Sequence, residues 1–243
     1  MARFTALLIH MAGSFILATA AVALIYGAWY PAPLDKAVGV SSIVLMMIAV
    51  DVILGPLLTF IVYQPEKKSL RFDLTMIVAL QLAAFAYGLT TIASGRPVWL
   101  VFNADRFDVV QASEVDTRYT AEANQEFRQP SWTGPKWVAS VNPKDIEKRN
   151  QLILESVEGG PDLPQRIDLF QPLDSEAAHL RTRAQPLDKL REFNLRDDVN
   201  AALTTWRQAD AWLPLMSRIQ PMVVLLNKAE AKPVAIVNLR PWS

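Results

Sequence analysis

The chain contains no cysteine and only two histidines, His10 and His179. Without cysteine there is no disulfide framework, thiol nucleophile or thiolate metal site, and the redox compartment is left open. His10 lies inside a long apolar segment and His179 beside arginines on a polar one, so neither a catalytic triad nor a histidine-rich metal site is expected. We therefore expect no metal and no cofactor.

An excess of charge of either sign is also missing, because 24 Lys and Arg residues are offset by 24 Asp and Glu residues. The basic footprint of a protein that binds nucleic acid is therefore absent. The sequence has no glycine-rich phosphate loop, and its many carboxylates are typical of a solvated surface. These observations favour a protein that is not an enzyme.

The charges that are present are concentrated in the second part of the chain. Residues 1–95 hold 5 Lys/Arg and 4 Asp/Glu, whereas residues 96–243 hold 19 Lys/Arg and 20 Asp/Glu. This contrast predicts a transmembrane domain over residues 1–95 and a water-soluble domain over residues 96–243. The expected fold class is a membrane protein with an N-terminal three-helix transmembrane bundle followed by a small α+β soluble domain.

The second apolar stretch, residues 40–63, is long enough to cross a bilayer, which requires about 20 helical residues. Asp51 lies near its centre, where a charge is unfavourable and a polar side chain usually faces other helices. Pro56 follows Gly55 and is expected to kink the helix, because its ring removes a hydrogen bond to the carbonyl of Val52. The stretch is therefore predicted to pack against neighbouring helices.

The first apolar stretch, residues 4–26, is predicted to be another span, and Trp29 and Tyr30 behind it are candidate anchors at the membrane interface. A cleavable signal peptide is the alternative, because residues 18–20 have the small-x-small form of a cleavage site, although the apolar run continues well past them. His10 is a candidate polar residue of the bundle and is more typical of packing or hydrogen bonding than of a proton relay.

A third apolar stretch, residues 74–93, completes the expected bundle. It contains Gln81, which is the polar counterpart of Asp51 and is predicted to face the bundle interior. The connector before the second stretch, residues 27–39, is predicted to be a short polar turn. His10, Asp51 and Gln81 are thus candidate residues for holding the bundle together or contacting a partner.

The distribution of basic residues predicts an orientation in the membrane. Arg3, Lys67, Lys68 and Arg71 flank the ends expected in the cytoplasm, whereas fewer basic residues flank the opposite ends. Three spans place the two ends of the chain on opposite sides. The soluble domain is therefore expected outside the cytoplasm.

The soluble half alternates between short strand patterns and amphipathic helices. Residues 98–102 and 107–110 suit a hairpin, and residues 222–227 and 234–239 suit a second one. Between them, Ile146, Ile153 and Val157 recur at helical spacing. Further strand and helix patterns are found at residues 136–141, 175–183 and 196–209. The mixture favours an α+β domain.

Several short motifs together resemble a known family. They are Trp29-Tyr30-Pro31, Val50-Asp51, Gly55-Pro56-Leu57-Leu58-Thr59, Gln81-Leu82-Ala83, Ala86-Tyr87-Gly88, Val101-Phe102, Asp105-Arg106-Phe107 and Pro241-Trp242. In this order and spacing they resemble the type IV pilin accessory protein family of the TfpX/TfpZ type, and the resemblance runs along the whole chain.

The resemblance implies a multi-pass protein of the bacterial inner membrane, with a cytoplasmic N-terminus and a periplasmic C-terminal domain. Such a protein assists the stability, assembly or surface display of a cognate major pilin by binding, together with other pilus assembly components. The alternative is a membrane-anchored sensor whose outer domain binds a small ligand, although the cytoplasmic segments are too short for an output domain. A transporter subunit is less favoured, because the spans carry few polar positions.

Overall fold

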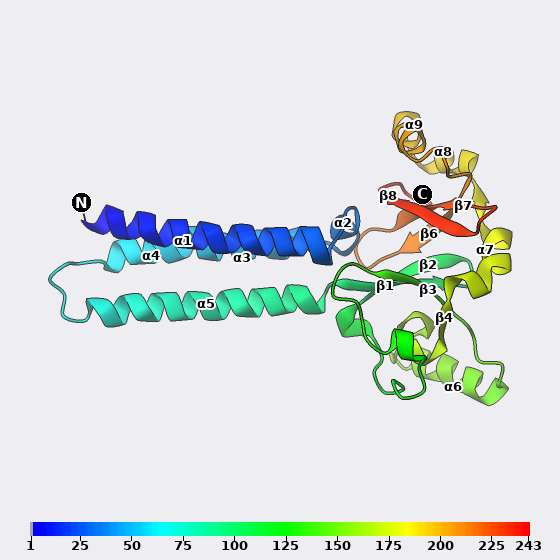
Figure 1. Ribbon diagram of the computed structural model, residues 1–243, viewed down its shortest axis with the longest axis horizontal. Helices are drawn as coiled ribbons and strands as arrows, with labels where there is room; N and C mark the ends of the chain where they lie inside the picture. The colour runs from blue at the N-terminus through cyan, green and yellow to red at the C-terminus, as the bar shows by residue number, and fades with distance from the viewer. Residues whose placement is uncertain (1) are drawn as a thin grey trace. The chain divides into compact units, whose positions relative to one another are not determined.

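The computed structural model describes residues 2–243, which form two compact units (Figure 1). The helical unit extends to Pro31 and resumes over Val40–Gly95, and the sheet unit comprises Ala32–Gly39 and Arg96–Ser243. The division between residues 95 and 96 falls at the predicted domain boundary. The connector differs from the prediction, since most of it belongs to the sheet unit.

The helical unit consists of three long helices, each long and apolar enough to cross a membrane. The first ends in a π-helical turn, and the second is interrupted by one. Their segments are α1 (Ala2–Leu24) with η1 (Ile25–Trp29), α3 (Ser41–Ala49) with η2 (Val50–Leu54) and α4 (Gly55–Val62), and α5 (Leu70–Ser94). The three predicted apolar helices are therefore present, and α5 begins before its apolar run, where Lys67 forms an ion pair with Asp73.

The sheet unit is built on an eight-stranded mixed sheet with the order β4-β3-β1-β2-β6-β7-β8, in which β5 pairs with β6. Two pairs, β1 with β3 and β2 with β6, are parallel, and the others are antiparallel. The strands are β1 (Pro97–Asn103), β2 (Arg106–Gln111), β3 (Lys136–Ser140), β4 (Phe170–Pro172), β5 (Gln185–Pro186), β6 (Ala211–Met216), β7 (Met222–Asn227) and β8 (Lys232–Val237).

Both predicted hairpins are present, as β1–β2 and β7–β8. The central strand β6 carries Pro214, which has no N–H to donate to a ladder, and its parallel pairing with β2 begins only at Leu215. Short helices lie among the strands: α2 (Leu34–Val38), α6 (Ile146–Val157), α7 (Ala177–Arg183), α8 (Leu190–Phe193) and α9 (Arg196–Thr205). Single 3₁₀ turns are η3 (Ala112–Glu114), η4 (Gln125–Phe127), η5 (Leu163–Gln165), η6 (Ile167–Leu169), η7 (Leu173–Glu176) and η8 (Leu187–Lys189).

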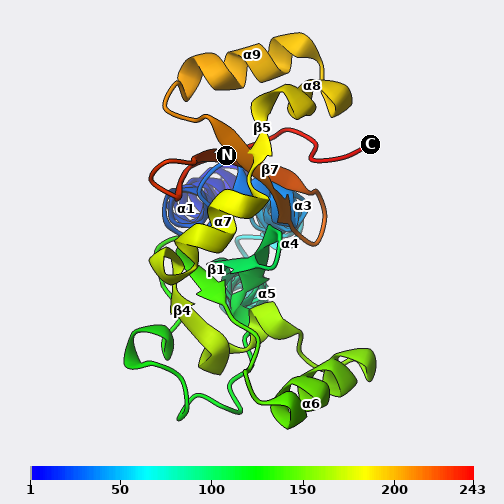
Figure 2. The ribbon, with the colours of Figure 1, turned by 90° about the vertical axis from the view of Figure 1, so that its right-hand side faces the viewer.

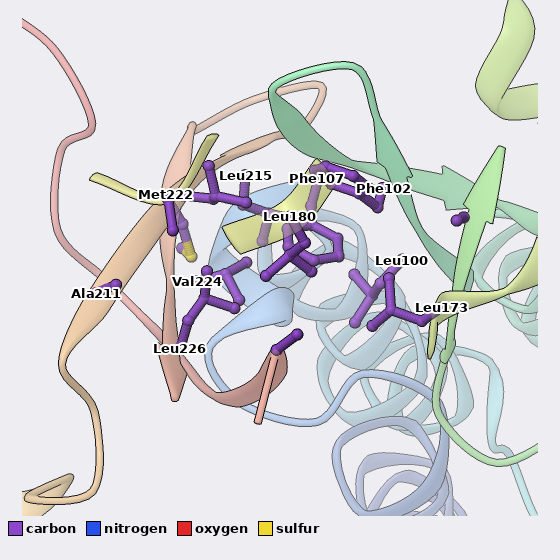
Figure 3. Close-up of a cluster of buried hydrophobic side chains, with 14 of the residues drawn as sticks. Leu100, Phe102, Phe107, Leu173, Leu180, Ala211, Leu215, Met222, Val224 and Leu226 are labelled. Atoms are coloured by element: carbon purple, nitrogen blue, oxygen red, sulfur yellow. The ribbon is translucent and has the colours of Figure 1, made fainter. Parts of the chain in front are cut away.

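The sheet is buried on both faces, which explains why β1 and β7 read as continuous apolar runs. Because successive side chains of a strand point to opposite faces, Leu100 and Phe102 join one core while Trp99 and Val101 join another. Figure 3 shows the first of these cores, in which Leu180 of α7 packs among side chains of β1, β2, β6 and β7. In Figure 2 the pair α8–α9 and the helix α6 lie at opposite ends of the sheet unit.

The connector between the first two long helices is part of the first core, and the prediction of a simple polar turn is wrong. Leu34 and Ala37 of α2 are fully buried in that core. The carbonyl of Ala37 accepts hydrogen bonds from the backbone N–H groups of Ile219 and Gln220 and from the Ser217 hydroxyl. Two apolar side chains among polar neighbours are enough to anchor this short helix. The connector and the sheet therefore fold as one body.

The helix α6 presents its apolar stripe outward. Asp145 caps its N-terminus by accepting from the N–H groups of Glu147 and Lys148. The residues whose spacing predicts the helix, Ile146, Ile153 and Val157, are exposed, and the buried side chain is Leu152 on another face. The periodicity thus identifies the helix correctly without identifying the side that packs.

Candidate functional site

The polar residues predicted to face the interior of the bundle, His10, Asp51 and Gln81, meet at one place in the helical unit. His10 on α1 lies with Nδ1 2.6 Å from the hydroxyl of Thr59 on α4 and with Nε2 2.8 Å from Oε1 of Gln81 on α5. An amide oxygen can only accept, so Nε2 carries a proton, and in a neutral ring Nδ1 accepts from the Thr59 hydroxyl. His10 thus connects all three helices.

Gln81 is the centre of this cluster. Its amide nitrogen donates to the hydroxyl of Ser14 at 3.0 Å and to the backbone carbonyl of Asp51 at 2.8 Å. Together with the bond from His10, the side chain makes three hydrogen bonds to two other helices. We call His10, Ser14, the Asp51 carbonyl, Thr59 and Gln81 the polar cluster.

The carbonyl of Asp51 is available to Gln81 because of the π-helical turn η2. In an α-helix it would accept from the N–H of Gly55, but that N–H donates to the carbonyl of Val50 instead. In a π-helix it would accept from residue 56, which is proline and has no N–H. The predicted irregularity around Pro56 is present as this π-helical turn, and it leaves the carbonyl of Asp51 to accept from Gln81.

Gly55 allows Gln81 to approach this turn. A Cβ atom added at Gly55 would overlap the side-chain amide of Gln81, whereas one added at Gly13 of α1 would meet no atom within 4 Å. The absence of a side chain at Gly55 is therefore a condition for the bond between Gln81 and Asp51. A sequence pattern cannot reveal this requirement, because Gly55 and Gln81 are 26 positions apart.

The carboxyl group of Asp51, unlike its backbone carbonyl, is not part of the polar cluster. Its residue is 1% exposed, and within residues 2–243 neither carboxyl oxygen has a hydrogen-bond partner. It lines a cavity of about 170 Å³ between α3–η2 and α5. Gln81, the polar counterpart of Asp51 in the sequence analysis, forms its hydrogen bond with the backbone carbonyl of Asp51. A buried polar group left in this way is unusual.

Trp29 and Tyr30, the candidate interface anchors, are 8% and 2% exposed. The Tyr30 hydroxyl donates to the carbonyl of Ile92 in α5 at 2.6 Å. A Cβ atom at Gly95 would lie 3.2 Å from that hydroxyl. A buried tyrosine hydroxyl needs a hydrogen-bond partner, and here the partner is on another helix. Tyr30 therefore links the C-terminal end of the first helix to that of the third.

The sheet unit contains a cluster of ion pairs that the sequence analysis missed. Arg166 is 11% exposed at its side chain and forms a two-pronged pair with Asp168 at 2.9 Å, and its Nε lies 3.6 Å from Asp116. Arg118 bridges Asp116 and Glu155 at 3.0 Å each. The pairs Arg166–Asp168 and Asp116–Arg118 are local, but the contacts that join them to each other and to Glu155 link distant parts of the sequence. We call these five residues the Arg166 cluster.

The Arg166 cluster combines two guanidinium groups with three carboxylates. Burial acts to raise the pKa of Asp116, but hydrogen bonds and charge from Arg118 outweigh it and lower that pKa. Hydrogen bonds to Asp116 and Glu155 raise the pKa of Arg118 in turn. The Arg166 guanidinium also stacks 3.9 Å from the ring centre of Tyr119. A neighbouring cavity of about 350 Å³ is lined by both signs of charge.

Histidine and acidic side chains are the potential metal ligands of this chain. Within residues 2–243 no group of three or more histidine or acidic side chains is placed to hold a metal ion. His179, the second histidine, lies on the exposed part of α7 between Glu176 and Arg183. The two clusters are thus a polar centre within three apolar helices and a group of ion pairs beside a mixed sheet.

Comparison with known proteins identifies the family. A family model described as "Fimbrial assembly protein FimB" matches residues 1–39. The "Fimbrial assembly protein, serogroup E1" of Dichelobacter nodosus is 33% identical over 90% of this chain and 89% of that protein. The serogroup I protein of the same organism is 32% identical over the same shares. No solved structure matches.

The chain therefore belongs to the family of fimbrial assembly proteins. The resemblance to a type IV pilus accessory family predicted from the sequence motifs is confirmed at this level. The similarity supports a role in pilus assembly.

Proposed function

We propose that this chain is an accessory protein of the bacterial inner membrane that assists assembly or surface display of type IV pili by binding the cognate major pilin, without catalysis. The observation that carries the proposal is the 33% identity over 229 residues to a protein named for fimbrial assembly. The three apolar helices, each of 22 residues or more, support the membrane location.

The two units suit the two parts of a pilin subunit. A pilin awaiting assembly has an apolar N-terminal helix in the membrane and a globular head outside it. The helical unit offers apolar helices to the former, and the sheet unit offers its surface to the latter. Binding both parts would hold a subunit until other pilus assembly components receive it.

The proposed orientation has the N-terminus in the cytoplasm and the sheet unit in the periplasm. Lys67, Lys68 and Arg71 between the second and third helices favour the cytoplasm. The connector belongs to the sheet unit, which agrees with both lying on one side of the membrane. A reporter active only outside the cytoplasm should be active when fused after Ser94 and silent after Lys68. The reverse pattern would overturn the orientation.

Deletion of the gene tests the function directly. Pilin should remain in the membrane, at an unchanged or reduced level, while surface pili largely disappear. A tagged copy of the full chain should restore the pili and should capture the major pilin from detergent-solubilised membranes. Normal surface piliation in the deletion strain, with no related accessory protein present, would remove the proposal.

A ligand-binding sensor is the second candidate, and the cavity of about 350 Å³ in the sheet unit is the observation in its favour. The segment between α4 and α5 spans only residues 63–69, which leaves no room there for an output domain. Capture of pilin by the tagged chain favours the accessory role. Specific retention of a small molecule without pilin would favour the sensor.

A further inference from the structure

A groove runs along one side of the helical unit. The cavity of about 170 Å³ beside Asp51 and a second cavity of about 230 Å³ share Val50 and Ala84 as lining residues. On α5 the two together extend from Ile77 to Thr91, which corresponds to about 21 Å at about 1.5 Å per residue. That length equals about four turns of a helix, so the groove is long enough for one helix to lie along another.

The lining of the groove is apolar apart from a few positions, and among these the carboxyl group of Asp51 is the buried one that lacks a hydrogen-bond partner among the described residues. Gln81 also lines the groove, but its amide is fully engaged in the polar cluster. A carboxyl group at this depth of a membrane is unfavourable as a charge and also as an unpaired neutral group. The occupant must therefore bring a hydrogen-bonding group to Asp51.

The shape of the groove favours a helix as this occupant. Ala84 and Gly88 lie four positions apart on α5, and small residues at this spacing allow two helix backbones to approach closely. Met47 rests against Gly88 and, as a flexible side chain, can adapt to a neighbour. A lipid acyl chain could fill an apolar groove but has no group to offer the carboxyl of Asp51.

We propose that this groove, between α3–η2–α4 and α5, is the docking site for a membrane helix of the partner, whose hydrogen-bond donor pairs with the carboxyl group of Asp51. This inference rests on the proposed function, which makes the partner helix that of the major pilin. It assigns opposite roles to the two sides of the second helix. The polar cluster holds the bundle together, while the carboxyl group of Asp51 is reserved for the partner.

The test fills the groove without touching the acid. Ala84→Leu places a large side chain in the groove at an exposed position, and Ala86→Leu makes the same change on another face of α5 that lines neither cavity. In membranes of a strain producing the major pilin, capture of pilin by tagged full-length Ala84→Leu should fall at least tenfold at unchanged abundance. Ala86→Leu should capture pilin as the unaltered chain does.

The acid itself is tested by Asp51→Leu and Asp51→Asn. Asp51→Leu should lose pilin capture while staying abundant, and Asp51→Asn should retain an intermediate level, because the amide keeps one acceptor oxygen. If Asp51→Leu does not accumulate, capture of pilin by Ala84→Leu decides whether the groove is the docking site, since that variant leaves Asp51 in place.

Failure of the proposed function and failure of the docking site give different results. If the unaltered chain captures no pilin, the proposed function fails. If it captures pilin and both Ala84→Leu and Asp51→Leu do so undiminished, the groove is not the docking site, although the function stands. A phospholipid found by native mass spectrometry in the unaltered protein, lost in Ala84→Leu with pilin capture intact, would also overturn the inference.

Discussion

Asp108 of β2 offers a quantitative test of the sheet unit. Its side chain is 18% exposed, and burial raises its pKa from the ordinary value of 3.8 to about 6, against the opposing charge of Arg106. The Arg106 guanidinium lies 3.5 Å away and is itself 45% exposed, so the pair contributes little. In the folded protein Asp108 is therefore easier to protonate than in the unfolded chain.

The sign of the pH dependence follows from this difference. Below pH 3.8 the group is protonated in both states and does not affect stability. Between pH 3.8 and about 6 the folded state holds a proton that the unfolded state has released, so the free energy of unfolding falls as pH rises. A difference of about two pKa units corresponds to about 3 kcal/mol lost above pH 6.

Asp108→Asn removes the ionisable group and should therefore stabilise the sheet unit at pH 8. The expected gain is about 1 to 3 kcal/mol, after allowing less than about 1 kcal/mol for the lost ion pair. The bond from the Asn103 amide can be kept, because asparagine retains an acceptor oxygen. The gain should shrink steadily and vanish near pH 4.

Urea unfolding of the full chain in mild detergent measures this effect. Tryptophan fluorescence follows mainly the sheet unit, because every tryptophan except Trp29 lies there. A gain of about 2 kcal/mol should move the midpoint by about 1 M urea. Asp105→Asn, in the exposed turn of the same hairpin, is the control and should shift nothing. Equal midpoints for Asp108→Asn and the unaltered chain at pH 8 would refute the argument.

Three further predictions concern the two clusters. Gln81→Leu removes three hydrogen bonds, each worth about 0.6 kcal/mol between membrane helices. It should therefore lower the stability of the helical unit by about 2 kcal/mol, measured by thermal circular dichroism. An unchanged melting midpoint would mean that the polar cluster does not hold the helices together. Gly55→Ala should reproduce much of this loss by displacing Gln81, whereas Gly13→Ala, in open space, should not. Arg166→Met leaves the buried carboxylate of Asp168 unpaired and should destabilise the sheet unit by about 2 to 4 kcal/mol in urea. Arg191→Met, at an exposed pair, should cost less than about 0.5 kcal/mol, and equal effects of the two would contradict the role of burial.

The parts of this fold that depend on local sequence were predictable. The helix predicted over residues 40–63 is present as α3, η2 and α4, because a helix satisfies the backbone of a long apolar run with its own hydrogen bonds. The hairpins β1–β2 and β7–β8 follow from two strand patterns separated by a short turn. The family was recognisable because its motifs recur in order along the chain.

The direction in which an apolar side chain packs was not predictable in the same way. Leu34 and Ala37 in the connector enter the core of the sheet unit, whereas Ile153 and Val157 of α6 remain exposed. Periodicity reports the local conformation, and a core forms wherever elements distant in sequence meet. The same limit hid the Arg166 cluster, because only the fold brings Arg166 to Asp116 and Arg118 to Glu155.

The polar residues of the helical unit were predictable in part. The amino-acid sequence by itself determined that His10, Asp51 and Gln81 lie within apolar helices, where polar side chains seek partners. Only the tertiary structure decided that the π-helical turn before Pro56 turns the Asp51 carbonyl to Gln81 and leaves the carboxyl group in a groove. The physical reason is that hydrogen bonds between helices depend on register and backbone path, and a change of a single turn redistributes them.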